Sequence, residues 1–229
     1  MAKILTKLEL HRLSSDFQLL QKHTQPSRSW LQHFFDLWYI MLGFDSNTLA
    51  NIADIDGNLR TLFDNGGTQQ TCNLLMASQA GGCGSFFPVP SASAGFVTWP
   101  NAGSTRYILY TGDHWGIVVG SNNVAVTPQD NALGAKIVQG AAAGQLLHGG
   151  TEILPPTFAD PNGLMVLRRY FTNSSGGNVT IEEVGMYSPG FFENDNSYLF
   201  SICRDVVAPA VVVADTELLV ATYTVQITV

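Results

Sequence analysis

The end of the sequence carries the pattern that most restricts the fold. From residue 219 onward, apolar and polar side chains alternate one by one. A period of two gives a β-strand one buried and one solvated face, whereas a helix would scatter the same side chains around its axis. The pattern therefore predicts a sheet with one face on a core. The apolar positions are Leu219, Ala221, Tyr223, Val225, Ile227 and Val229.

Short apolar runs separated by turn residues extend this pattern over much of the chain. Between residues 59 and 119 they recur at spacings of about ten residues, broken by Gly, Asn and Pro. Residues 164–171, 179–187 and 198–206 are also predicted strands, and the turn residues at 173–177 predict a hairpin between the first two. The sequence is thus mainly β, and we expect an antiparallel β-sandwich domain over residues 46–229.

The first 45 residues follow a different period. Leu10, Leu13, Phe17 and Leu20 recur at spacings of three and four, which predicts a helix with one apolar stripe. After Pro26, a second helix is expected up to about residue 42. This second helix is apolar nearly all round, so either the β domain or another subunit must cover it.

We interpret residues 1–45 as a two-helix anchor segment that docks on another subunit. On this interpretation, removal of residues 1–42 leaves a β domain that still folds. The predicted assembly interface consists of Leu10, Leu13, Phe17, Leu20, Trp30, Leu31, Phe34, Phe35 and Trp38.

The composition limits the classes of partner. Only 13% of the residues are charged, 45% are hydrophobic, and the formal net charge is −7. An acidic chain lacks the basic face that binds phosphates, so we expect no nucleic acid partner. A surface this poor in charge is a solubility risk for a monomer. The composition fits burial of surface against protein partners as well as it fits a glycine-rich β protein.

Membrane, metal and cofactor signals are weak. The longest apolar run, residues 34–44, is interrupted by Asp36 and is shorter than the roughly 20 residues of a spanning helix. We therefore expect no membrane insertion. Cys72, Cys83 and Cys203 lack the spacing of a zinc site, and no glycine-rich phosphate loop is present. No cofactor or metal site is predicted.

Catalytic arrangements are equally sparse. Cys83 is a conceivable nucleophile with His114 or His148 as its base, but glycines flank it and no catalytic signature surrounds it. We interpret the chain as a non-enzyme. Residues 193–197 offer oxygen ligands without the glycine and closing glutamate of a helical calcium loop, so we interpret them as a solvated loop.

Two further sets of side chains have structural and functional interpretations. Arg168 and Arg169 are expected to pair with Glu182 and Glu183 across the predicted hairpin. An aromatic set is interpreted as core, with a sugar-stacking platform as the alternative. The aromatic residues are Trp99, Tyr107, Tyr110 and Trp115.

The order of motifs over residues 105–229 resembles structural proteins of tailed bacteriophages and related viruses. The motifs are WGIVVG at 115–120, AVTPQDNAL at 125–133, GAAAGQL at 140–146, RYFTNSSG at 169–176, VTIEEVGMY at 179–187 and CRDV at 203–206. The resemblance implies a virion protein, made in the host cytoplasm, whose partners are other virion structural proteins and copies of itself.

A tail, baseplate or fibre-attachment component, assembled as a symmetric multimer, fits this resemblance together with the low charge. One alternative is a head decoration or head-fibre protein. Another is a carbohydrate-binding module that recognises a host-surface glycan through the aromatic set.

Overall fold

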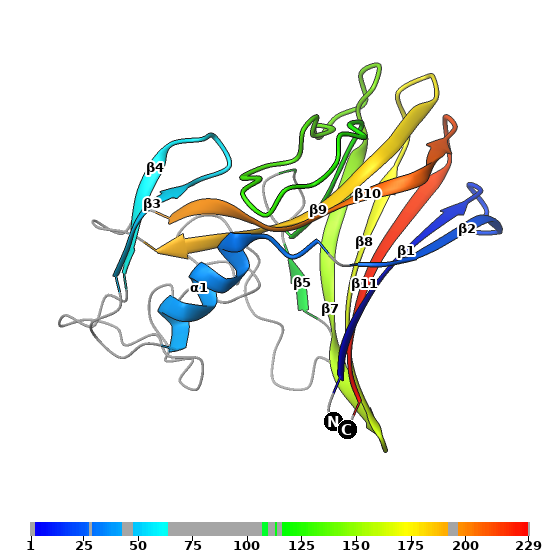
Figure 1. Cartoon of the computed structure of the whole chain (residues 1–229). Helices are drawn as coiled ribbons and strands as arrows, with labels where there is room; N and C mark the ends of the chain where they lie inside the picture. The colour runs from blue at the N-terminus through cyan, green and yellow to red at the C-terminus, as the bar shows by residue number, and fades with distance from the viewer. Residues whose placement is uncertain are drawn as a thin grey trace.

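The computed structural model describes residues 3–27, 29–42, 48–63, 107–109, 113, 116–191 and 197–228 (Figure 1). Within these ranges the chain is mainly β, and its strands pair in antiparallel fashion, as predicted. The elements are β1 (Lys3–Leu13), β2 (Leu19–Pro26), α1 (Gln32–Leu42), β3 (Thr48–Ala53), β4 (Leu59–Phe63), β5 (Tyr107–Leu109), β6 (Gly116–Gly120), β7 (Leu147–Ala159), β8 (Asn162–Thr172), β9 (Val179–Phe191), β10 (Ser197–Val213) and β11 (Leu218–Thr228).

The strands form one large sheet and two smaller ones. The six-stranded sheet has the order β2-β1-β11-β8-β7-β5, the three-stranded sheet has the order β10-β9-β6, and β3 pairs with β4. Strand β11 lies near the middle of the large sheet, and the alternation in its sequence is visible in its burial. Ala221 and Tyr223 are buried, whereas Thr222 and Thr224 on the opposite face are partly exposed.

The prediction of a helix over residues 10–20 is wrong. These residues form the end of β1, a tight turn and the start of β2. Leu8 pairs with Tyr223 and Leu10 with Ala221, so β1 lies beside β11 in the large sheet. This long-range pairing overrides a local spacing that also fits a helix.

The second predicted helix is present as α1, so the described residues contain one short helix and not the predicted pair. Leu8 and Leu10 of β1 are fully buried in the main core. An N-terminal segment that can be removed without loss of the β domain is incompatible with this arrangement.

The predicted hairpin between β8 and β9 is also wrong. These two strands lie in different sheets, and residues 173–178 cross between them. The buried side-chain amide of Asn173 donates to the backbone carbonyls of Gly177 at 2.7 Å and Val213 at 2.8 Å. Turn residues indicate a reversal of the chain, but they do not determine whether the flanking strands pair with each other.

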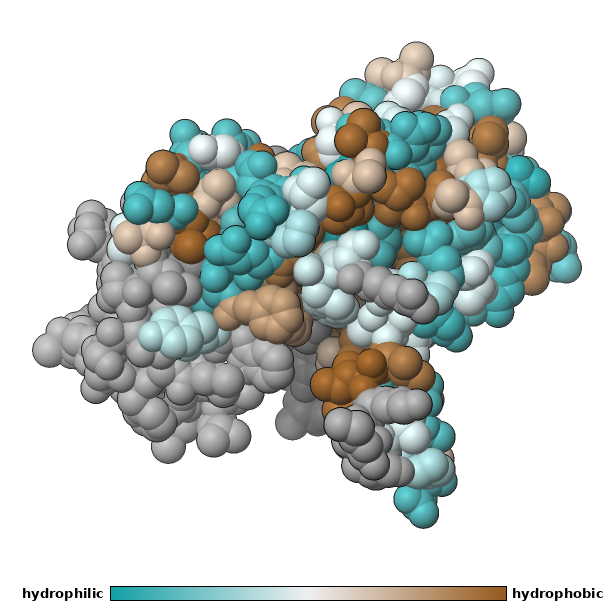
Figure 2. All heavy atoms as spheres, in the orientation of Figure 1, coloured by the Kyte–Doolittle hydropathy of each residue, from teal (hydrophilic) through white to brown (hydrophobic). Residues whose placement is uncertain are grey.

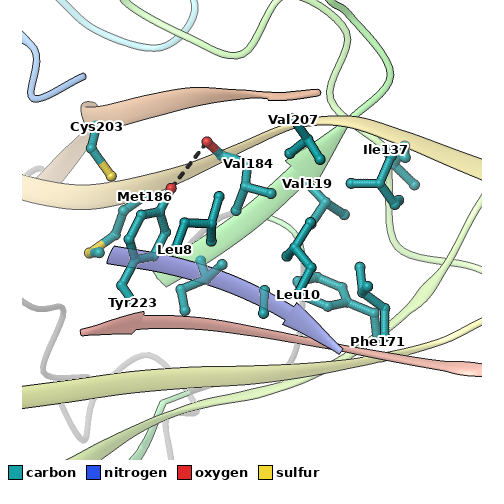
Figure 3. Close-up of a cluster of buried hydrophobic side chains, with 14 of the residues drawn as sticks. Leu8, Leu10, Val119, Ile137, Phe171, Val184, Met186, Cys203, Val207 and Tyr223 are labelled. Atoms are coloured by element: carbon teal, nitrogen blue, oxygen red, sulfur yellow. Dashed lines mark hydrogen bonds between the residues drawn. The ribbon is translucent and has the colours of Figure 1, made fainter. Parts of the chain in front are cut away.

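One buried cluster joins the two larger sheets (Figure 3). Leu8, Leu10 and Tyr223 come from the six-stranded sheet, and Val184 and Met186 from the three-stranded sheet. The sheets therefore pack face to face across a shared apolar core. Among the three cysteines, Cys203 is buried in this cluster, and burial raises the pKa of its thiol well above the ordinary value.

Buried polar groups connect the sheets beside β10. The hydroxyl of Tyr223 donates to the backbone oxygen of Val184 at 3.2 Å (Figure 3). It also lies 3.0 Å from Oδ2 of Asp205. Ser27 donates its hydroxyl proton to the same carboxylate oxygen at 2.7 Å. The carboxylate of Asp205 on β10 therefore joins three parts of the chain. It bonds Tyr223 on β11 of the large sheet and Ser27, the residue that follows β2.

A buried arginine connects the sheets at the opposite edge. The guanidinium of Arg169 on β8 donates from Nε to the backbone oxygen of Gly149 and from Nη1 to that of Ile117, both at 2.7 Å. Ile117 belongs to β6, so the second bond crosses from the large sheet to the small one. Burial lowers the pKa of Arg169 to about 10, although the charge of Asp113 opposes the shift.

We expect Tyr223→Phe to lower the free energy of unfolding by about 1–2 kcal/mol, because it removes one donor from a buried carboxylate and a buried carbonyl. Tyr170→Phe is the matched control, since Tyr170 is partly exposed and should change stability by less than about 0.5 kcal/mol. Urea unfolding of both variants measures the difference. Equal effects would show that the hydroxyl of Tyr223 does not connect the sheets.

Candidate functional site

Arg204 on β10 is a buried arginine, 3% exposed, that bonds two carboxylates. Its Nε donates to Oε2 of Glu183 at 2.7 Å, and its Nη1 donates to Oδ2 of Asp130 at 2.6 Å. Its Nη2 donates to the backbone oxygen of Val124 at 3.1 Å. The guanidinium therefore bonds the three-stranded sheet to the segment between β6 and β7.

Glu183 completes this network from β9. Besides Arg204, it accepts the backbone N–H of Gly134 at 3.0 Å and that of Ala135 at 2.7 Å. Nearby, the hydroxyl oxygen of Tyr187 accepts the N–H of Leu133 at 2.9 Å. Because both oxygens of Glu183 are engaged by donors, the arrangement fits a structural anchor for residues 121–146 better than an acid–base centre.

The predicted pairing of Arg168 and Arg169 with Glu182 and Glu183 is wrong, because β8 and β9 lie in separate sheets. Arg168 instead donates a hydrogen bond from Nη2 to Oε2 of Glu152 on β7, at a distance of 2.6 Å. Sequence alternation correctly indicated that these charges lie on strands, but it could not identify the strands on either side.

We expect Arg204→Met to lower the free energy of unfolding by about 3–5 kcal/mol, because it leaves the carboxylate of Glu183 buried without its cation. Lys22→Met is the control, since Lys22 pairs with Glu9 at 2.8 Å on the exposed face and such a pair contributes about 0–1 kcal/mol. Chemical unfolding of both variants tests the comparison. A loss below about 1 kcal/mol for the Arg204 variant would contradict the structural role of this network.

His33 is a second buried titratable group, on the first turn of α1. Its ring meets Phe200 of β10 edge-on at 5.7 Å between centroids. Its Nδ1 atom is buried without a hydrogen-bond partner. Burial lowers the pKa of His33 below its ordinary value of 6.5, and a hydrogen bond to the backbone of Ser201 opposes this shift only in part.

This lowered pKa predicts a loss of stability on acidification. The unfolded chain binds a proton at His33 near pH 6.5 and the folded chain only at a lower pH, so stability falls as the pH drops through 6.5. We expect His33→Gln to reduce the difference in urea midpoint between about pH 7.5 and about pH 5.5. An unchanged difference in the variant would show that another group causes the pH dependence.

The nine predicted interface residues divide by exposure. Leu10 and Leu31 are buried within the chain and are not available to a partner. Leu13, Trp30 and Phe34 are partly buried, while Phe17, Leu20 and Phe35 are exposed. The side chain of Trp38 lies outside the described residues. These residues therefore do not form the apolar faces of two helices that the spacing predicted.

Three exposed apolar residues lie in or beside the turn between β1 and β2. We call Phe17, Leu19 and Leu20 the tip patch, and Phe17 is 66% exposed. The N–H of Phe17 donates to the oxygen of Ser14 at 2.9 Å, and Phe17 has a φ of +62°. Glycine is favoured at this position of a three-residue hairpin loop, and a side chain there costs about 1–2 kcal/mol.

A second apolar patch lies at the other end of the six-stranded sheet. Ile4, Ile227, Gly163 and Phe158 are register partners in one row across β1, β11, β8 and β7. The ring of Phe158 lies over Gly163, so a Cβ atom there would meet it at 3.2 Å. Ile4, Phe158 and Ile227 are exposed by 67%, 82% and 48%, and we call them the open-end patch.

The row belongs to the face that forms the core further along the same strands. On β1, Leu8 and Leu10 are fully buried on this face, and Trp30 covers Thr6 by donating from Nε1 to its hydroxyl at 3.3 Å. Further toward the start of β1, Ile4 on the same face is exposed, and no contact to it from another layer is seen among the described residues. Figure 2 shows hydrophobic surface at this end and at the β1–β2 end of the large sheet. Sequence alternation placed Ile227 on the inner face but gave no sign that the covering layer ends first.

Comparison of the chain with known protein families, curated proteins and solved structures finds no match. Among the described residues, no group of three His, Cys, Asp or Glu side chains is placed to hold a metal ion, and no helix has the length and apolar character to cross a membrane.

Several predicted chemical groups lie outside the described ranges. Cys83 and His114 are among them, while His148 is buried with its ring 4.9 Å from that of Phe171. Residues 193–196 and the side chains of the aromatic set are also outside the described part of the chain. Among the described residues, the two apolar patches are surface features that a functional assignment has to explain.

Proposed function

We propose that this chain is a non-enzymatic structural subunit of a tailed-bacteriophage virion, most consistent with a place in the tail, baseplate or fibre-attachment region. It is built as a β-sandwich and works as a symmetric multimer in contact with other virion proteins. The proposal is based on the order of motifs over residues 105–229 and on the exposed apolar surface of the described residues.

The observation that carries the proposal is the pair of exposed apolar patches at opposite ends of one sheet. Phe17 and Phe158, the most exposed aromatic residues in these patches, are 66% and 82% exposed. Only 13% of the residues are charged, so these exposed apolar side chains favour association with other protein over a monomeric state.

The buried network around Arg204 supports the same assignment. Charged groups buried on a strand are matched by partners on neighbouring segments, which gives a rigid scaffold and leaves no free acid–base pair there. Rigidity of this kind suits a subunit that repeats in identical contacts.

We expect the chain to be present at a fixed copy number in virions purified by density gradient, and to remain bound after washing in high salt, because apolar contacts are not screened. Quantitative mass spectrometry of the particles measures this, with a host cytoplasmic enzyme as the contamination control. Density assigned to the chain in the head would favour the head-decoration alternative. Absence from purified particles would contradict the proposal.

A further inference from the structure

We propose that copies of this chain associate head to tail, with the tip patch of one copy seated on the open-end patch of the next. The inference rests on the proposed function as a self-assembling subunit and names the contact. The tip patch is Phe17, Leu19 and Leu20, and the open-end patch is Ile4, Phe158 and Ile227.

The two patches lie at opposite ends of the same strand. Ile4 is near the start of β1, and the tip follows its last residue, Leu13. Nine residue steps at about 3.4 Å separate these positions by about 30 Å. The N- and C-termini lie at the open end, away from the β1–β2 tip (Figure 1). A second copy displaced along the strand direction therefore brings its tip to the open end of the first.

The shapes of the patches favour this contact over a two-fold one. The tip patch consists of one residue of a tight hairpin turn and the first two residues of β2, whereas the open-end patch is a row on a sheet face. Two tight turns bury little of each other, but a turn can pack on an uncovered sheet face. Contacts between unlike patches are heterologous and build rings or filaments.

The apolar area is sufficient when the patches are combined. A large apolar side chain offers roughly 200 Å², so the exposed fractions give about 340 Å² of apolar surface on the tip patch and about 390 Å² on the open-end patch. Together they supply about 730 Å², comparable with the apolar part of the smaller standard interfaces, which bury about 1,200–2,000 Å² in total. Exposed surface of this kind is otherwise an aggregation hazard.

The conformation of Phe17 is the second observation. It has a left-handed φ of +62° at a loop position that favours glycine, yet its ring is mostly exposed. Among the described residues, Phe17 buries too little of its ring for apolar contacts to offset this backbone strain. Burial of the ring against the next copy accounts for an aromatic residue at this place.

Two variants separate binding from folding. Phe17→Gly removes the ring and relieves the left-handed strain, so it should leave the melting temperature unchanged or higher. Phe158→Thr removes the most exposed ring of the open end. We expect each variant of the full chain to weaken self-association at least tenfold in sedimentation velocity over a concentration series.

Two controls match these changes. Thr216→Gly relieves a left-handed φ of +69° in the turn before β11 without touching either patch. Leu59→Ala removes an apolar side chain that is 66% exposed on β4, outside both patches. Both controls should associate as the unchanged chain does. A tenfold loss in either control would overturn the assignment to the two patches.

Mixing the two variants tests the head-to-tail geometry directly. The Phe17 variant keeps its open end, and the Phe158 variant keeps its tip, so an equimolar mixture should form one-to-one dimers that do not grow, although neither variant dimerises alone. Dimers of the Phe158 variant alone would indicate a tip-to-tip contact, and dimers of the Phe17 variant alone an open-end contact. Either result overturns the proposal.

Two remaining outcomes separate this inference from the proposed function. An unchanged chain that stays monomeric at every concentration overturns head-to-tail association in solution. Multimers that neither variant weakens overturn the assigned contact. If the chain is nevertheless present at fixed copy number in virions, the proposed function stands and only the head-to-tail contact fails.

Discussion

The face-to-face packing of the two larger sheets depends on buried polar groups that satisfy one another across the gap. At one edge, the guanidinium of Arg169 in the large sheet donates a hydrogen bond to β6. Beside β10, the carboxylate of Asp205 accepts hydrogen bonds from the hydroxyls of Tyr223 and Ser27. A buried donor or acceptor without a partner is costly, so these groups fix how the sheets are placed on each other. Apolar contacts alone would not specify that placement.

The same placement leaves part of the large sheet uncovered. The inner face of β1 is fully buried at Leu8 and exposed at Ile4, with Trp30 packed over Thr6 between them. Within the described residues, the strands continue beyond the layer that packs on them. A face that is core at one end therefore becomes surface at the other, and this change gives the molecule an apolar end without any unusual residue in its sequence.

The proposed role follows from this geometry and from the opposite tip. An apolar turn and an uncovered apolar face on one rigid sheet are features of a subunit made to contact others. The network of Arg204, Glu183 and Asp130 holds the segment before β7 against the small sheet, so the scaffold between the two ends is firmly connected.

The sequence by itself determined the mainly β class, the two faces of β11 and the helix α1, because a period of two or a long apolar helical run is encoded locally. Only the tertiary structure decided that residues 10–20 are strand and turn, since β11 supplies the partner that makes β1 a strand. It also decided that β8 and β9 separate into two sheets, and that Arg204 rather than Arg168 neutralises Glu183. In the candidate site, the spacing singles out Phe17 and Leu20 only through a helix that is absent, and it gives no sign of Phe158 and Ile4. Their exposure depends on where a distant segment stops covering the sheet, and no local pattern records that distance.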